Sequence, residues 1–587
     1  MTSQTVGGPS PVPEVPALST GHTAFRAARD LLLRHAQDPR RARAEFAWPR
    51  FEHFNWAVDW FDVIAAENRA TALRVLTPEG DQEADFATLS ARSDQVAGWL
   101  AELGVRRGDA VLLLLDNGVE VWEVLLALMK LRAVAVPVFT TLDPDEVQER
   151  LRRSRARHLV ASASAAGPVG GAEVPGVRVV TGGELPGWEP YERSRMHSGG
   201  CPAPGPTPAD EVMSCFFTSG STARPKLVAH THRSYPVGHL TGMFWAGFRP
   251  GDVHLNVSSP GWAKHPWSSF FAPWNAEATI VSVDTRHADP EFLLDALERT
   301  RATTFCAPPS IWRALVRAGL TGRDIVLREA MSVGEPLTQD IVTAVRDAWG
   351  VSVRNGYGQS EVTAMTGVLP VGTDDPRSLG RPLPGCEIVL CPVGTETPGE
   401  EGEVCLDLTA GAAGLMHGYL DDDGQRIEPA PASLRLYRTG DLARRESDGS
   451  LTFIGRIKDV FRAEDGTLVA PAALEAALLE HPAVHEVGVV TVPATPDAPA
   501  GATTPLVAKA HVVPAAGWNA GPVTAQALLR HASGGAGMAG LSVVEFADEL
   551  PRTESGKIYR EALRAQLRSP LVEFTAPVGS GAAGAHD

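Results

Sequence analysis

Residues 216–226 read Phe-Phe-Thr-Ser-Gly-Ser-Thr-Ala-Arg-Pro-Lys. The two aromatic residues predict the end of a buried strand, and the small hydroxyl residues around Gly220 predict a loop directly after it. Short side chains and a glycine let backbone N–H groups approach a phosphate closely, while the hydroxyl groups and Lys226 add donors and charge. The Gly-Lys-Ser/Thr ending of ordinary NTPase P-loops is missing. The stretch therefore predicts either a different kind of phosphate loop or a polar surface turn.

Four further motifs follow this loop along the chain. They read Ser-Val-Gly-Glu-Pro (332–336), Asn-Gly-Tyr-Gly-Gln-Ser-Glu (355–361), Tyr-Arg-Thr-Gly-Asp (437–441) with Gly-Arg-Ile-Lys-Asp (455–459), and Pro-Arg-Thr-Glu-Ser-Gly-Lys (551–557). Together with 216–226, the ordered set resembles the adenylate-forming (AMP-binding) superfamily, which includes acyl- and aryl-CoA ligases, luciferases and peptide-synthetase adenylation domains. The resemblance extends from about Phe51 to about Arg564. It is closest to the acetyl- and medium-chain acyl-CoA synthetases, because 55–62 and 261–267 are typical of that branch.

The composition argues against several other classes of protein. The 587 residues suffice for three to four domains, and a hydrophobic content of 44% is ordinary for a soluble enzyme. The six cysteines are scattered without a C-x-x-C pair, which argues against a zinc site or a disulfide framework and favours a cytoplasmic location. No apolar run predicts a membrane span or a secretory signal. A formal net charge of −17 disfavours nucleic acid as a partner.

The pattern of apolar residues predicts an α/β fold with mostly parallel sheets. A strand near 108–115, a helix near 120–131 and a strand near 134–138 form one parallel strand–helix–strand unit. A second alternating set is expected over 254–308. The strand-rich segments 387–408 and 436–454 predict a small β subdomain, and 165–208 and 493–522 are expected to be loop-rich.

These features predict the division of the chain into domains. We expect a disordered N-terminus (1–20), a large N-terminal adenylation domain that binds ATP and the acid (21–457), a small mobile C-terminal α/β domain (458–565) and a flexible tail (566–587). By resemblance, Lys458 is the hinge between the two domains. A plain loop lysine is the alternative interpretation of that residue.

The resemblance implies a reaction. A carboxylate is a poor electrophile, but transfer of AMP from ATP converts it into a mixed anhydride and releases pyrophosphate. Catalysis of such a step is mostly positioning and electrostatic stabilisation. The phosphates would be held by Thr218, Ser219, Gly220, Ser221, Thr222 and Lys226, and Mg²⁺ by Glu361. The remaining ATP-binding residues would be Gly334, Glu335, Pro336, Tyr357, Gln359, Ser360, Asp441 and Arg456.

Individual roles follow for some of these residues. Tyr357 would lie flat on the adenine, and Asp441 would accept hydrogen bonds from the two ribose hydroxyls. Lys557 would reach in from the small domain to bridge the carboxylate and the α-phosphate. The alternative for Lys557 is a solvated surface lysine, which only the surrounding motif argues against.

The acid-binding pocket is expected around Trp262, His265, Gly356 and Gly358, with Trp267 close by. Acetate-specific relatives have a tryptophan where this chain has Gly358, so the resemblance implies an acid larger than acetate. His265 would either polarise a polar group of the substrate or be a packed, structural histidine.

Three segments depart from the pattern of the family. Ala223 replaces a glycine of the phosphate loop, the segment 461–471 lacks the usual Tyr-Arg pair near Thr467 and Leu468, and 534–540 lacks a usual Pro-Tyr-Lys. The last two belong to the part that faces CoA. The sequence therefore predicts ATP- and Mg²⁺-dependent activation of a medium-chain or aryl acid, followed by transfer to CoA.

Two alternatives stay open. One is an adenylating enzyme that passes its AMP-activated intermediate to a carrier protein, an amine or another small nucleophile, including nitrite activation for diazotisation of an aryl amine. The other is a degenerate nucleotide-binding scaffold, which the presence of Glu361, Asp441 and Lys557 disfavours.

Overall fold

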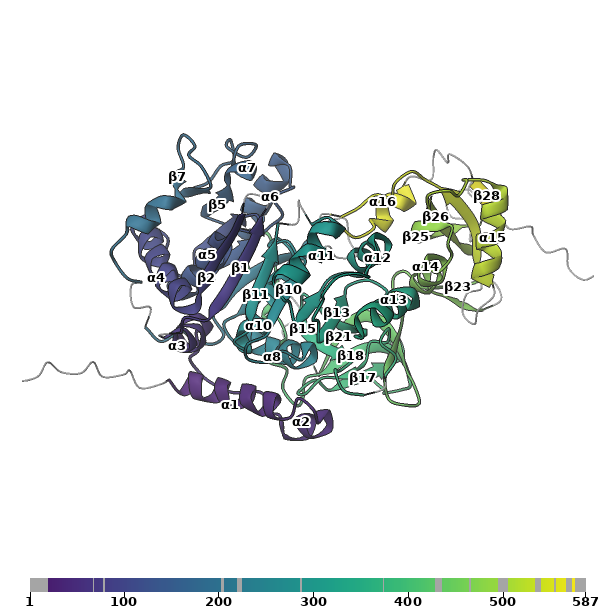
Figure 1. Ribbon diagram of the computed structural model, residues 1–587, viewed down its shortest axis with the longest axis horizontal. Helices are drawn as coiled ribbons and strands as arrows, with labels where there is room; N and C mark the ends of the chain where they lie inside the picture. The colour runs from purple at the N-terminus through teal and green to yellow at the C-terminus, as the bar shows by residue number, and fades with distance from the viewer. Residues whose placement is uncertain are drawn as a thin grey trace, which may run out of the picture.

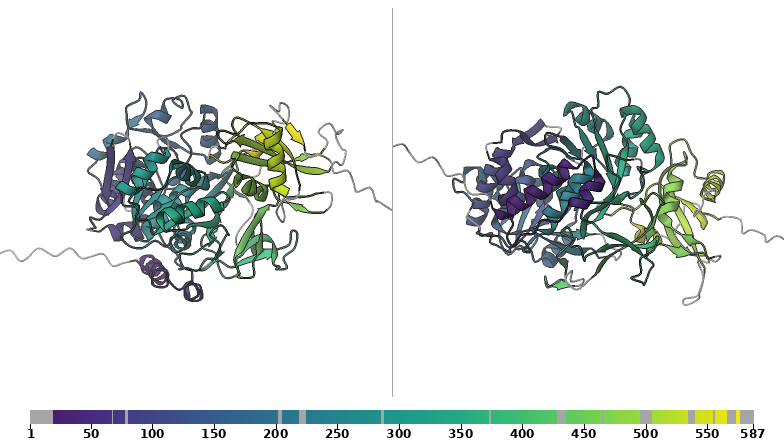
Figure 2. Two further views of the ribbon diagram at one scale, coloured as in Figure 1. Left: turned by 45° about the vertical axis from the view of Figure 1, so that its right-hand side comes forward. Right: turned by 90° about the horizontal axis from the view of Figure 1, so that it is seen from below.

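The computed structural model describes residues 19–66, 68–77, 80–201, 205–218, 224–284, 288–372, 374–427, 435–463, 466–494, 505–533, 540–553, 556–565 and 573–575. The C-terminal part, drawn in light green and yellow, lies at one end of the molecule in all views (Figures 1 and 2). The remaining chain forms a larger body built on two nine-stranded sheets and one four-stranded sheet.

The first nine-stranded sheet carries the predicted phosphate loop. Its strands run in the spatial order β20-β19-β9-β8-β4-β3-β5-β6-β7. Their bounds are β3 (Ala110–Leu114), β4 (Val134–Pro137), β5 (His158–Ser162), β6 (Arg178–Thr181), β7 (Glu189–Pro190), β8 (Val212–Thr218), β9 (Lys226–Thr231), β19 (Gly418–Leu420) and β20 (Arg426–Ile427). The accompanying helices are α4 (Phe86–Glu102), α5 (Val119–Leu131), α6 (Pro144–Ser154), α7 (Ala163–Ala166) and the 3₁₀ helix η2 (Tyr191–Met196). The predicted unit over 108–138 is β3–α5–β4, with β3 and β4 parallel.

The second nine-stranded sheet carries the motifs at 332–336 and 355–361. Its spatial order is β16-β15-β14-β13-β12-β10-β11-β1-β2. The bounds are β1 (Thr71–Thr77), β2 (Gly80–Asp85), β10 (Val253–Asn256), β11 (Thr279–Val283), β12 (Thr304–Cys306), β13 (Glu329–Val333), β14 (Val353–Gln359), β15 (Val362–Gly367) and β16 (Arg381–Pro382). All neighbours from β14 to β1 are parallel, whereas β15, β16 and β2 add antiparallel edges.

One set of helices accompanies the second sheet, and another set forms the N-terminal segment of the chain. They are α8 (Ser234–Ala246), α9 (Lys264–Pro266), the π-helix η3 (Trp267–Phe271), α10 (Ala272–Asn275), α11 (Pro290–Arg299), α12 (Pro309–Ala318) and α13 (Gln339–Trp349). The N-terminal helices are α1 (Thr20–Arg34), α2 (Pro39–Glu45), the π-helix η1 (Trp56–Phe61) and α3 (Asp62–Ala65). The largest hydrophobic core takes residues from both sheets and from α4, α5 and α8.

Two smaller sheets complete the molecule. The predicted β subdomain is an antiparallel sheet in the order β17-β18-β21-β22, with β17 (Ile388–Cys391), β18 (Glu401–Asp407), β21 (Leu436–Arg445) and β22 (Leu451–Arg456). The C-terminal part contains β23 (Phe461–Arg462), β24 (Leu468–Val469), β25 (Val484–Pro493), β26 (Leu506–Pro514), β27 (Leu541–Phe546), β28 (Glu573–Thr575), α14 (Pro471–Leu479), α15 (Pro522–Ser533) and α16 (Arg560–Ala565). The predicted fold class, α/β with mostly parallel sheets and a small C-terminal α/β domain, is confirmed.

The structure differs from the sequence analysis in three segments. The expected connection 165–208 contains the strands β6 and β7, and the expected loop-rich segment 493–522 contains β26. Strand β28 lies in the expected flexible tail and pairs with β27 as the fourth strand of the small sheet. These strands are short or carry alanine and proline, so their apolar pattern is weak. Residues 1–18 lie outside the described part, and α1 starts at Thr20 with Ser19 as its N-cap.

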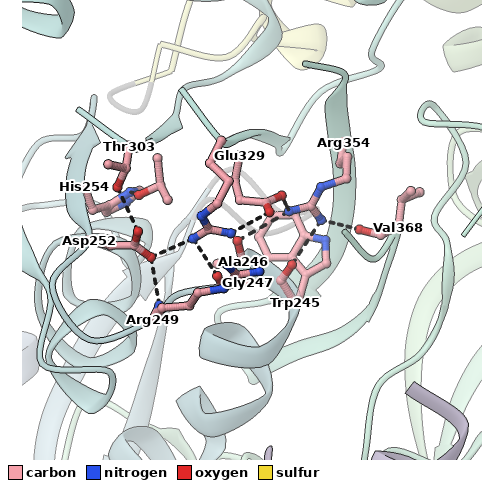
Figure 3. Close-up of polar contacts among 12 residues, drawn as sticks. Trp245, Ala246, Gly247, Arg249, Asp252, His254, Thr303, Glu329, Arg354 and Val368 are labelled. Carbon is pink, nitrogen blue, oxygen red and sulfur yellow. Dashed lines mark hydrogen bonds and ion pairs between the residues drawn. The ribbon is translucent and has the colours of Figure 1, made fainter. Parts of the chain in front are cut away.

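A buried charge network fixes the end of α8 beneath the second sheet (Figure 3). Arg354 on β14 pairs with Glu329 on β13 at 2.7 Å and donates to the carbonyl oxygens of Trp245 (3.0 Å) and Val368. A guanidinium satisfies carbonyl groups that a helix C-terminus leaves without partners. Because Arg354 is three residues before Tyr357, the network joins α8 to the strand that carries the predicted adenine site.

Candidate active site

Tyr357 and Gln359 on β14 contact Asp441 on β21, although the two strands belong to different sheets. These residues are called the Tyr357–Asp441 corner. The Tyr357 hydroxyl donates to Asp441 Oδ2 at 2.7 Å, and Gln359 Nε2 donates to the same oxygen at 2.8 Å. The Tyr437 hydroxyl in turn donates to Gln359 Oε1 at 2.9 Å. Burial and the nearby Asp441 carboxylate raise the pKa of Tyr357 well above its ordinary value. The phenol therefore stays a hydrogen-bond donor, and Asp441 is held as a buried acceptor.

Arg456 completes this corner. It lies opposite Asp441 in the β21–β22 ladder, and its Nε is 3.5 Å from Asp441 Oδ1. The Arg456 side chain is about half exposed, whereas that of Asp441 is buried. The corner thus presents a fixed carboxylate beside an aromatic ring and an accessible cation, which suits a nucleoside with ribose hydroxyls and a phosphate.

The predicted phosphate loop connects the antiparallel strands β8 and β9. Thr218 and Lys226 are paired at the two ends of this hairpin. Ser219, Gly220, Ser221 and Thr222 lie outside the described residues, as does Ala223. The Thr218 Oγ1 atom is buried and has no hydrogen-bond partner among the described residues. A buried hydroxyl without a partner is costly unless a further group binds it.

Glu361 lies next to this hairpin. Its Oε1 accepts a hydrogen bond of 2.9 Å from the Tyr419 hydroxyl, and Lys226 Nζ lies 4.5 Å from the centre of the Tyr419 ring. The turn that carries Glu361 is held by backbone, since Met416 N–H donates to the Glu361 carbonyl at 2.8 Å. His230 Nε2 lies 2.7 Å from the Ser360 carbonyl oxygen. Tyr419 therefore braces both the carboxylate and the lysine.

Lys557 is carried on a tight loop before α16. Thr553 N–H donates to the Lys557 carbonyl at 2.7 Å, and Gly556 N–H donates to the Thr553 carbonyl at 2.8 Å. Arg552 donates to the Gly556 carbonyl at 2.6 Å and pairs with Glu486 at 2.5 Å. Residues 554–555 lie outside the described part. The loop is thus fixed by the backbone on one side and by Arg552 on the other.

The side chain of Lys557 reaches across to the large domain. Its Nζ lies 5.8 Å from the centre of the Trp262 ring. A Cβ placed on Gly334 would be 3.8 Å from both Lys557 Nζ and Trp262 Cζ2, so the three residues are neighbours. Burial and the Arg456 charge lower the pKa of Lys557, while Glu335 and Asp441 raise it. The structure therefore places Lys557 between the 332–336 turn, which includes Pro336, and the Gly261–Trp267 turn.

Lys458 lies between the two parts of the molecule. Ile457 N–H donates to the Gly440 carbonyl of the large domain at 2.9 Å, whereas the Asp459 carboxylate pairs with Arg564 of the small domain at 2.9 Å. Lys458 itself is exposed and makes no hydrogen bond to another described residue. This position is the one that a hinge would need.

His265 is fully buried and faces the interior. Its Nε2 lies 3.0 Å from Asn117 Oδ1 and its ring packs on Trp122, while Nδ1 has no partner among the described residues. Burial lowers the pKa of His265 to about 3. These contacts favour the structural interpretation of His265 over contact with a substrate.

The glycines of the expected pocket face groups that already fill their surroundings. A Cβ on Gly356 would lie 2.5 Å from Trp245 Cε2, and a Cβ on Gly358 would lie 2.4 Å from the carbonyl oxygen of Thr363 on β15. Trp245 stacks on Trp267 with 5.6 Å between ring centres. Close packing therefore explains both glycines in this structure, and their contact with an acid stays a prediction.

Comparisons with known proteins show which family this chain belongs to. Residues 61–420 match the family model "AMP-binding enzyme", and residues 473–557 match "AMP-binding enzyme C-terminal domain". The chain belongs to the AMP-binding enzymes. Since 61–420 is more than half of the chain, the predicted resemblance to the adenylate-forming superfamily is confirmed, and so is the prediction that the protein is an enzyme.

Several named AMP-binding enzymes are similar over most of this chain. 4-Hydroxybutyrate–CoA ligase 1 of Metallosphaera sedula is 34% identical over 531 residues, which cover 87% of this chain and 90% of the relative. The mitochondrial acyl-coenzyme A synthetase ACSM3 of Homo sapiens is 30% identical over 75% of this chain and 78% of the relative. The crystal structure of the anthranilate CoA ligase AuaEII with anthranoyl-AMP gives a TM-score of 0.77 at 25% identity, and covers 88% of this chain and 98% of that one.

Sequence reasoning missed three residues of this AMP-binding enzyme. Tyr419 has no recognisable motif around it, and its role depends on β19 returning to β9. Tyr437 stands inside the 437–441 motif, but only the fold brings it to Gln359. Trp245 lies at the end of a helix that is buried throughout, so the sequence offers no periodic signal for it. Within the described residues, none of the helices combines the length and apolar character needed to cross a membrane.

Proposed function

We propose that this protein is a carboxylic acid–CoA ligase that uses ATP and Mg²⁺ and prefers an acid larger than acetate. The observation that carries the proposal is the position of Lys557. It lies beside Trp262 and Gly334, and the charges of Asp441 and Arg456 shift its pKa in opposite directions. This position supports a role in which the Lys557 ammonium group would act between a bound nucleotide and the acid.

The residues of the chain suit the first half-reaction in stated roles. Asp441 would accept the ribose hydroxyls, and Tyr357 would stack on the adenine. The carboxylate oxygen of the acid attacks the α-phosphorus of ATP, the bond to the pyrophosphate oxygen breaks, and pyrophosphate leaves. The Lys557 ammonium would stabilise the negative charge that develops on the α-phosphate, and it would orient the carboxylate for in-line attack.

The donor set fits Mg²⁺. Glu361 offers a carboxylate oxygen beside a hairpin whose Thr218 hydroxyl has no partner among the described residues. Mg²⁺ prefers one or two carboxylates together with substrate phosphates and water. When bound, the ion would neutralise charge on the phosphates. Glu361 would hold it, and Tyr419 would fix the orientation of that carboxylate.

Acid-dependent release of pyrophosphate tests this function. We would measure it with acetate, 4-hydroxybutyrate, benzoate, anthranilate and a medium-chain fatty acid, each with and without CoA, and identify the products by mass. We expect a higher kcat/KM for one of the larger acids than for acetate, and a CoA thioester as the product. Absence of acid-dependent pyrophosphate release with every acid would overturn the proposal.

The acceptor is a separate question that the same assay answers. The β23–β24 hairpin carries Leu468 where the resemblance leads one to expect part of a Tyr-Arg pair, so the face toward CoA differs from the usual one. An adenylate that forms at a normal rate but gives no thioester would favour the second candidate function. That candidate is transfer of the activated intermediate to a carrier protein, an amine or another small nucleophile.

We also propose the cytoplasm as the location. The support is chemical, because five buried cysteines are thiols and not disulfides: Cys215, Cys306, Cys386, Cys391 and Cys405.

A further inference from the structure

We infer that α16 couples the hinge to Lys557, and that Arg560 and Arg564 are the positioning residues of this coupling. The inference rests on the proposed function, because it assigns Lys557 to the first half-reaction. Neither arginine touches a substrate. Both act through the short helix that follows the loop carrying Lys557.

The first contact joins α16 to α14. Arg560 Nε donates to Glu475 Oε1 at 3.2 Å, and Arg560 NH2 donates to Glu475 Oε2 at 2.5 Å. Glu475 is buried and also accepts a hydrogen bond of 2.8 Å from Val489 N–H on β25. A bidentate arginine–carboxylate pair fixes orientation as well as distance. Since Arg560 is three residues after Lys557, this pair anchors the C-terminal end of the loop.

The second contact joins α16 to the hinge. Arg564 NH2 lies 2.9 Å from Asp459 Oδ1, and Asp459 directly follows Lys458. The Asp459 carbonyl also accepts a hydrogen bond from Thr491 Oγ1 at 3.4 Å. Ile457 N–H donates to the Gly440 carbonyl of the large domain, and Asp459 N–H and Val460 N–H donate to the Arg456 carbonyl at 2.9 and 3.0 Å, so Lys458 lies in a turn whose backbone hydrogen bonds a rotation would have to open. The Arg564–Asp459 ion pair thereby attaches Asp459 to the small domain, so that the hinge ends before this residue.

The two contacts lie one helical turn apart on the same side of α16. Arg560 and Arg564 are four residues apart, which places both side chains on one face of the helix. Leu563, between them in sequence, is buried with Val490 and Val492 of β25. A rotation at Lys458 therefore moves Asp459, α16 and Lys557 as one body. Without Arg564, Asp459 would lose its ion pair with α16, and Lys557 would sample more positions.

The experiment is a double-mutant cycle with Arg564→Ala, Asp459→Ala and the double variant. We expect each to slow acid-dependent pyrophosphate release roughly tenfold, because small misplacements of a catalytic group cost one to two orders of magnitude. The KM for ATP should change less than twofold, since Tyr357 and Asp441 belong to the large domain. The double variant should be no slower than either single variant. Arg564→Lys should recover most of the rate.

Three further measurements separate positioning from mere stability. Thioester formation from supplied adenylate should change less than threefold, because a looser hinge does not impede rotation away from Lys557. Trypsin cleavage after the exposed Lys458 should be several-fold faster in Arg564→Ala, which reports the hinge even if the proposed function fails. Arg530→Ala, on the exposed side of α15, is the matched control and should match the unmodified protein in every assay.

Several outcomes would overturn the inference. They are additive effects in the double variant, equal losses in both half-reactions, unchanged trypsin cleavage at Lys458, or the same changes in Arg530→Ala. The unmodified protein tests the proposed function separately through its acid-dependent pyrophosphate release.

Discussion

Replacing Lys557 by alanine should separate the two half-reactions. The ammonium contacts the large domain through the Trp262 ring at 5.8 Å. A cation–π contact of this kind contributes about 0.5–1 kcal/mol, so its loss should reduce the population of the closed arrangement by at most about fivefold. Loss of a donor that stabilises the transition state costs about 2.7–4 kcal/mol, which is roughly 10²–10³ in rate. The larger effect therefore belongs to the chemical step.

The assay is single-turnover release of pyrophosphate at saturating ATP and acid. We expect Lys557→Ala to slow it roughly 10²–10³-fold while the KM for ATP changes little, because Tyr357 and Asp441 are intact. Transfer from supplied adenylate to the acceptor should continue at nearly the unmodified rate. A variant that loses both steps equally, or that keeps the first step within about fivefold of the unmodified rate, would refute the assigned role.

The pH profile offers an independent check on Lys557. Burial and Arg456 lower the pKa of Lys557 from its ordinary value of 10.5. The ammonium should therefore lose its proton at a lower pH than a free lysine, and the first half-reaction should decline on the alkaline side below pH 10.5. Lys557→Arg should abolish this decline, because a guanidinium stays protonated. An identical alkaline limb in Lys557→Arg would assign the titration to another group.

The remaining predictions concern the metal, the strands, the hinge and acid stability. Glu361→Gln removes charge at constant size, so it should raise the Mg²⁺ concentration needed for pyrophosphate release; an unchanged Mg²⁺ titration would remove Glu361 from the metal site. Gly358→Ala should lower the free energy of unfolding by about 1–3 kcal/mol, since its Cβ would meet the Thr363 carbonyl oxygen at 2.4 Å, and an unchanged melting temperature would show that β15 moves freely. Lys458→Pro restricts φ at the hinge, so adenylate should still form while transfer to the acceptor slows; intact transfer would show that no rotation is needed. Burial lowers the pKa of His232 from 6.5 to about 4, so the unfolded chain binds more protons between these values, and stability should fall as pH drops from about 6.5 to 4. His232→Leu should flatten this slope in thermal melts, and an unchanged slope would exclude His232 as a source.

The sequence predicted the fold where the apolar pattern was strong. The β3–α5–β4 unit could be found because β3 is a continuous apolar run and α5 has buried residues on nearly every side. Strand β28 could not, because Glu573–Thr575 is only three residues long and is stabilised by pairing with β27. Short strands of this kind depend on partners that are distant in sequence, which a local pattern does not contain.

The candidate site shows the same difference between local sequence patterns and contacts that are distant in sequence. Residues inside short ordered motifs, such as Tyr357, Asp441 and Lys557, could be predicted from the sequence, and the structure brings Tyr357 into contact with Asp441, whose charge also acts on Lys557. Their mutual contacts were not, since the hydrogen bond between Tyr357 and Asp441 spans 84 positions. Gly358 illustrates the limit, because its close approach to the β15 backbone can be known only from the fold.

The return of β19 to β9 has a consequence for how the protein is made. Strand β9 ends near residue 231, but its outer neighbour is residues 418–420, which the ribosome adds almost 190 residues later. At typical rates of about 5–20 residues per second, the edge of the first sheet stays unpaired for roughly 10–40 seconds during synthesis. An unpaired edge is prone to pair with other chains. The β8–β9 hairpin of the predicted phosphate loop is thus among the last parts of the large domain to be completed, and truncated chains that end before Tyr419 should aggregate through β9.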